Sequence, residues 1–123
     1  MTRHFPRAES LIPGELRERL IENGRAADTE DGFDPFPVVK LFMPDAAATW
    51  LATEAVPLGS DLRLYGLVDL GLGCPDLGYA MLSSIEAMRG RLGLPVERDR
   101  CFRPEHRLSH YAVLARYAGL VIT

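Results

Sequence analysis

The chain has 123 residues, of which 47% are hydrophobic and 25% are charged, and its formal net charge is −3. These proportions are typical of a globular domain and exclude a disordered or fibrous chain. A chain of this length can bury one apolar core without disulfides or a structural metal, so we expect a single domain over residues 1–123.

The first predicted element is an amphipathic helix. Pro13 suits the first turn of a helix, Glu15 lies near its positive end, and Asn23-Gly24 is a favourable C-terminal cap, so we expect the helix to end there. The polar segment that follows, from Asp28 to Pro35, is predicted to be an exposed loop without calcium-binding spacing. The apolar stripe of the helix consists of Ile12, Leu16, Leu20 and Ile21.

Between Phe36 and Leu82 the apolar residues recur with a period of two, which predicts four strands. Trp50 alternates within the second strand, so we expect it to be mostly buried. Short turns separate the strands and favour an antiparallel meander, because parallel neighbours need longer crossovers. The strands are expected at Val38 to Phe42, Thr49 to Val56, Leu62 to Leu72 and Leu77 to Leu82.

Three further elements are predicted after the meander. Ser83 and Glu86 have the spacing of a capping box and predict a short helix. The alternation from Val96 to Phe102 predicts a fifth, partly exposed strand. Pro104 opens a final helix that is apolar almost all round, as in a docked helix or a dimer contact.

These elements predict an α+β fold, in which an antiparallel meander sheet of four to five strands packs against an N-terminal and a C-terminal helix. The protein is expected to be a monomer, or a homodimer through the C-terminal helix.

The start of the chain, residues 1–7, is basic and is followed by Ala8-Glu9-Ser10 instead of the apolar stretch of a secretory signal. No apolar stretch is long enough for a membrane span. We therefore expect a cytoplasmic protein, in which Cys74 and Cys101 are free thiols.

Several short motifs together resemble a family of small bacterial proteins of unknown function that are encoded largely on plasmids and integrative elements. The resemblance covers about residues 10–104 and implies a mobile-element setting, but it assigns no catalytic residue. The chain departs from the pattern at Cys74-Pro75 and in the helix after Pro104, which we interpret as an addition to the core. The motifs are Thr49-Trp50, Thr53-Glu54, Tyr65-Gly66-Leu67-Val68, Leu77-Gly78-Tyr79, Leu82-Ser83 and Leu94-Pro95-Val96-Glu97-Arg98-Asp99.

Basic residues are concentrated near the C-terminal end. Residues 1–88 hold fourteen acidic and seven basic side chains, whereas residues 89–123 hold three acidic and seven basic ones. Arg98, Arg100 and Arg103, next to Phe102, form a candidate basic surface for an acidic protein or for nucleic-acid phosphates. The negative net charge disfavours direct nucleic-acid binding, so a protein partner is the preferred interpretation.

An alternative site consists of Glu54, Asp69, Glu97 and Asp99. If at least three of these carboxylates converged, they could hold Mg²⁺ or Mn²⁺ for phosphodiester cleavage. The alternating Glu-Arg-Asp-Arg order favours cross-strand ion pairs on a solvated strand instead.

A soft-metal site is the third candidate. Cys101, His106 and His110 lie close in sequence, and the two histidines share a helical face, but Cys74 is the only obvious fourth ligand. We expect no metal and no cofactor.

We therefore expect a noncatalytic accessory protein of a bacterial mobile element, which acts by protein contact and modulates host defence. The alternative is a metal-dependent enzyme that processes nucleic acid, or a module that binds it.

Overall fold

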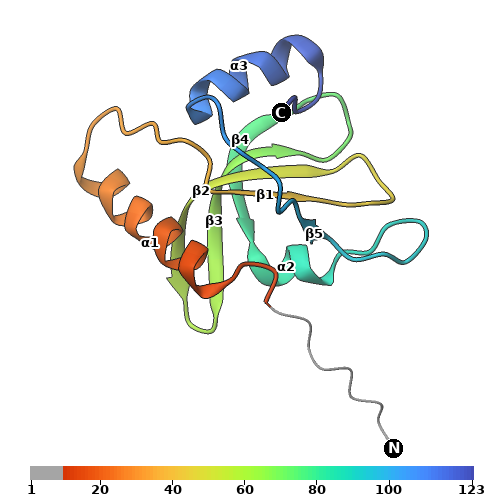
Figure 1. Cartoon of the computed structure of the whole chain (residues 1–123), viewed down its shortest axis with the longest axis horizontal. Helices are drawn as coiled ribbons and strands as arrows, with labels where there is room; N and C mark the ends of the chain where they lie inside the picture. The colour runs from red at the N-terminus through yellow and green to blue at the C-terminus, as the bar shows by residue number, and fades with distance from the viewer. Residues whose placement is uncertain (1–9) are drawn as a thin grey trace, which may run out of the picture.

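The computed structural model describes residues 10–123 (Figure 1). The basic start of the chain, residues 1–7, lies outside the described residues, so our interpretation of it stays a prediction. Among the helices that are described, none is long and apolar enough to span a bilayer. The elements are α1 (Gly14–Thr29), β1 (Val39–Phe42), β2 (Thr49–Leu58), β3 (Asp61–Asp69), β4 (Asp76–Met81), α2 (Leu82–Ala87), β5 (Glu97–Arg98) and α3 (Leu108–Ala118).

The strands form one five-stranded sheet in the order β4-β3-β2-β1-β5, and every neighbouring pair is antiparallel. The first four strands are neighbours in chain order, so the predicted meander and the predicted α+β class are confirmed. β3 ends at Asp69, three residues before the expected end, and Leu72 is exposed in the loop that follows.

The sheet has helices on both faces (Figure 1). Successive residues of β2 point to opposite faces, as the strand period requires. Trp50 belongs to the buried cluster that also contains Leu20 of α1 and Ile85 of α2. Leu51 belongs to a second buried cluster, which contains Tyr111 of α3. Trp50 is only 4% exposed, which confirms the prediction that it is buried.

The predicted end of the first helix is wrong, because α1 continues past Asn23-Gly24 to Thr29. Both residues serve packing against β2. The Asn23 side-chain amide donates a hydrogen bond to the Thr53 carbonyl at 2.9 Å. A Cβ on Gly24 would stand 2.4 Å from the Ala55 carbonyl oxygen, so only glycine lets the helix approach the strand this closely.

The predicted capping box of the second helix is also wrong. Ser83 lies inside α2, and its own side chain does not cap the helix. Asp61, at the start of β3, accepts hydrogen bonds from the Ser83 hydroxyl and from the Ser83 N–H. These bonds lower the pKa of Asp61. The cap is therefore supplied by a distant strand.

The last helix begins at Leu108 instead of Pro104, and it is capped in the same way. Asp34, in the loop before β1, accepts hydrogen bonds from the Ser109 N–H and from the Ser109 hydroxyl. The outer side of α3 leaves Val113 and Tyr117 exposed. A homodimer through this helix stays a prediction.

Candidate binding site

The predicted fifth strand is shorter than its sequence alternation suggested. β5 pairs with β1 through Glu97 and Arg98 only. The Asp99 carboxylate then accepts the Cys101 N–H at 2.9 Å, and the Phe102 N–H reaches the Asp99 carbonyl at 3.3 Å. Such an Asx turn bends the chain away from the sheet. Arg98, Arg100 and Arg103 are therefore not held on one face by strand alternation.

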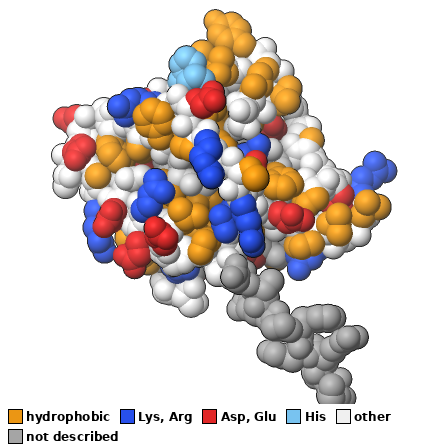
Figure 2. Space-filling view, viewed as in Figure 1, with side chains coloured by type: hydrophobic (Ala, Val, Ile, Leu, Met, Phe, Trp, Pro, Cys, Tyr) orange, Lys and Arg blue, Asp and Glu red, His pale blue; other side chains and the backbone are white. Residues whose placement is uncertain are grey.

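The bend nevertheless gathers the predicted basic residues around one depression between α1 and the segment after β5. This depression has a volume of about 260 Å³, and we call it the arginine groove. In Figure 2, basic side chains gather near the centre of the visible face, between α1 and β5. The residues that line the arginine groove include Arg19 of α1, Pro37, Arg98, Arg100, Phe102 and Arg103.

The acidic residues that alternate with these arginines do not pair with Arg98. Asp99 pairs with Lys40 of β1, at 3.5 Å between Nζ and Oδ2. Glu97 is exposed on β5. Within residues 10–123, neither Arg19 nor Arg98 has an ion pair or a hydrogen bond to its side chain. Within the described part of the chain, the Arg19 and Arg98 guanidinium groups of the groove are therefore available to a ligand.

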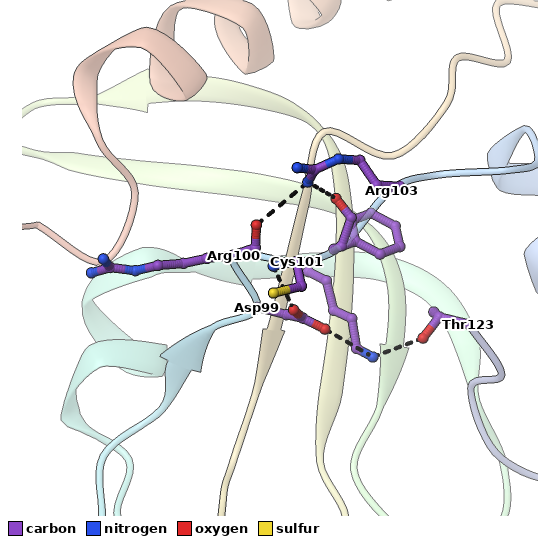
Figure 3. A network of polar contacts seen from close by, with 7 residues as sticks. Asp99, Arg100, Cys101, Arg103 and Thr123 are labelled. Carbon is purple, nitrogen blue, oxygen red and sulfur yellow. Dashed lines mark hydrogen bonds and ion pairs between the residues drawn. The ribbon is translucent and has the colours of Figure 1, made fainter.

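Backbone carbonyls hold the side chain of Arg103, which lines the groove. The Arg103 guanidinium donates to the Phe102 carbonyl at 3.0 Å and to the Arg100 carbonyl at 3.4 Å. Figure 3 shows the side chains of Arg100 and Arg103 extending toward the side on which α1 lies. One guanidinium nitrogen of Arg103 donates to both carbonyls. The N–H groups of its other guanidinium nitrogens are the ones that can donate to a ligand.

A larger cavity, of about 660 Å³, adjoins the groove. It lies between the β1–β2 turn, the β3–β4 loop and the segment after α3. Lys40 and Asp99 line both depressions, so their ion pair stands between them. The Lys40 ammonium also donates to the Thr123 hydroxyl at 2.7 Å, as Figure 3 shows.

Glu54, Asp69, Glu97 and Asp99, which all lie within the described residues, do not form one metal-binding cluster. Asp69 pairs in register with Thr49, and Glu54 lies five residues further along β2. At the rise of a strand this separates the two by roughly 15 Å. Asp69 and Asp99 line the larger cavity. The described residues contain no group of three or more His, Cys, Asp and Glu side chains that could hold a metal ion.

The individual carboxylates have structural partners instead. Asp69 is buried, and its two oxygens accept the N–H groups of Gly71 at 2.8 Å and of Val121 at 3.0 Å. Glu54 faces Tyr65 across β2 and β3. Burial, and then the nearby Asp28 carboxylate, raise the pKa of Glu54.

Of the third candidate, the structure brings the two histidines together. The rings of His106 and His110 stack at 4.2 Å between centroids. Cys74 and Cys101 are both exposed free thiols. Cys74 lies in the β3–β4 loop, and Cys101 lies in the turn after β5.

Two residues of the site, Arg19 and Lys40, were not predicted from the sequence. Lys40 stands between the buried Val39 and Leu41, so strand alternation could have placed it on the opposite face. Arg19 carries no such signal, because its place in the groove depends on how α1 packs against the sheet.

A comparison with known protein families shows which family the chain belongs to. The molecule is a small α+β protein with a meander sheet, and residues 11–122 match the family described as Protein of unknown function (DUF2958). The chain therefore belongs to the DUF2958 family. The match includes α3, whereas the sequence resemblance ended at about residue 104. No curated protein and no solved structure matches the chain.

Proposed function

We propose that this protein acts without catalysis, by binding an acidic segment of a partner protein in the arginine groove. The observation that carries the proposal is the convergence of Arg19 from α1 with Arg98, Arg100 and Arg103 from the segment after α2. Guanidinium groups bind carboxylates with two parallel hydrogen bonds, which favours a carboxylate-rich partner.

The dispersal of the candidate carboxylates supports a noncatalytic role. Asp69 and Asp99 are engaged with backbone N–H groups, and Asp99 also pairs with Lys40. Carboxylates held in this way fix the conformation of the chain, which favours a structural role over a role as general acid, general base or metal ligand.

The proposal keeps the setting that the sequence resemblance implied. We place the protein in the bacterial cytoplasm, as an accessory protein of a mobile element whose partner belongs to host defence. The resemblance to plasmid-encoded proteins is the only support for this part of the proposal.

Binding of defined probes tests the proposal. Wild-type protein should bind a labelled peptide of alternating aspartate and serine more tightly than single-stranded DNA of equal charge, measured by fluorescence anisotropy. Replacing Arg98, Arg100 and Arg103 by glutamine should weaken peptide binding by at least about tenfold, because each charge-assisted contact is worth about 1.5–3 kcal/mol. Denaturant unfolding should change little, since exposed ion pairs contribute only about 0–1 kcal/mol each.

A matched variant separates the groove from net charge. Arg25, Arg91 and Arg116 are exposed and do not line the groove, and replacing them by glutamine removes the same charge. This control should keep most of the peptide affinity. Equal weakening by both variants would contradict a specific groove. Tighter DNA binding, with a salt dependence that flattens only in the groove variant, would favour the nucleic-acid module.

A further inference from the structure

The larger cavity beside the arginine groove is lined mostly by apolar side chains. Its volume of about 660 Å³ lies in the range of natural ligand pockets, which combine apolar walls with a few placed polar groups. The apolar walls come from the β1–β2 turn and from the segment that follows α3. They include Phe42, Met43, Ala46, Leu120 and Val121.

Hydrogen bonds hold these walls in place. The Asp69 carboxylate binds the Gly71 N–H and the Val121 N–H, so it ties the β3–β4 loop to the segment after α3. On the opposite side, the Met43 N–H donates to the Ala48 carbonyl at 3.1 Å and closes the β1–β2 turn. The cavity is therefore formed before any ligand arrives, and a ligand need not order its walls.

The polar groups of the cavity lie at its border with the groove. Lys40 and Asp99 line both depressions, and Lys40 is the one cation among the residues that line the cavity. A ligand that leaves the cavity on this side meets first the Lys40 ammonium and then the guanidinium groups. The cavity and the arginine groove thus adjoin at Lys40 and Asp99.

We infer that the cavity receives one large apolar side chain of the same acidic segment that binds in the arginine groove. The partner is then an acidic protein segment with a Phe, Leu or Met anchor beside its carboxylates. Charge complementarity selects this occupant. An apolar residue alone would leave the Arg19 and Arg98 guanidinium groups without a partner among the described residues, and an acidic segment without an anchor would leave the cavity unfilled. Anchors of this kind in preformed pockets dominate many interfaces.

This inference rests on the proposed function, and three peptides separate the two. The first is the aspartate-serine peptide with a central phenylalanine, the second has serine in its place, and the third keeps the phenylalanine but carries asparagine for aspartate. The phenylalanine should tighten binding of the acidic peptide by about tenfold to a hundredfold, as burial of one large apolar side chain implies. Equal binding of the first two peptides, with both weakened by the groove variant, overturns the anchor and leaves the proposed function standing. Failure of both acidic peptides to bind better than the third overturns both.

A cavity-filling variant locates the anchor. Ala46 is exposed and lines the cavity, so Ala46→Trp should remove the advantage of the phenylalanine peptide. Ala87→Trp, at an exposed alanine of α2 outside both depressions, should keep it. Equal advantage in both variants overturns the assignment of the anchor to this cavity.

Cross-linking of the wild-type protein locates the anchor residue of the peptide without the use of a variant. A peptide with benzoylphenylalanine at the anchor position should label Met43 or the segment Leu120–Val121 on irradiation, read out by mass spectrometry. Labelling confined to other segments overturns the inference.

Discussion

The face of the sheet that packs against α1 and α2 is closed by a larger set of buried apolar side chains than the face that packs against α3. On the first face, α1 approaches β2 so closely that Gly24 has no room for a Cβ. On the second face, α3 packs on Leu51 and Leu67, while Lys40 and Phe42 of β1 border the larger cavity.

We therefore expect stability and binding to reside on different faces of the sheet. A tightly closed face can carry most of the hydrophobic stabilisation. The incompletely covered face can then keep a preformed cavity and exposed charges without unfolding the chain.

Truncation of Trp50 should show the contribution of the closed face. Trp50→Ala removes a side chain that is only 4% exposed, and such deletions cost about 3–5 kcal/mol of unfolding free energy. Equilibrium unfolding in urea measures the loss. A change as small as that of a surface substitution, about 0.5 kcal/mol, would show that this face does not dominate stability.

Two glycines of α1 should respond to alanine with opposite signs. Gly14→Ala meets no atom within 4 Å and should raise the unfolding free energy by up to about 1 kcal/mol through helix propensity. Gly24→Ala places a Cβ against the Ala55 carbonyl, and overpacking of this kind costs about 1–3 kcal/mol. Urea midpoints compare the two variants. Stabilisation by both would mean that α1 can move away from β2 at little cost.

Loss of the cap on α3 should loosen the other face. Asp34→Ala removes the acceptor for the Ser109 N–H and should cost about 1 kcal/mol. Amide hydrogen exchange should quicken in the first turn of α3 before it quickens in α1. Asp31→Ala, at an exposed position in the same loop, is the matched control and should leave exchange in α3 unchanged.

The free energy of unfolding should depend weakly on pH through Glu54. Because its pKa is raised in the folded protein, the folded state binds this proton more tightly than the unfolded chain does. Stability therefore falls as the pH rises from the ordinary value of 4.5 through the raised value. Glu54→Gln should be more stable than wild type above this window and equal to it below. Melting temperatures over a pH series test this, and a difference that is constant with pH would indicate altered packing.

The meander and much of the candidate groove could be predicted from the sequence. Alternation and turn residues such as Pro44-Asp45 act between close neighbours in the chain, so they predict strands without knowledge of the rest of the fold. Arg98, Arg100, Arg103 and Phe102 lie within six residues of one another, and a short segment keeps such groups together whatever its backbone does.

The tertiary structure decided the helix ends and the partners of the charged residues. Asn23-Gly24 has the composition of a helix stop, but contacts with β2 favour continuation of α1. The caps of α2 and α3 come from Asp61 and Asp34, far from the helices in sequence. Such long-range contacts depend on how the elements pack, and local patterns carry no information about them. For the same physical reason the sequence did not predict Arg19 in the groove. Of the four carboxylates grouped from the sequence, Asp69 and Asp99 line the larger cavity and the other two do not.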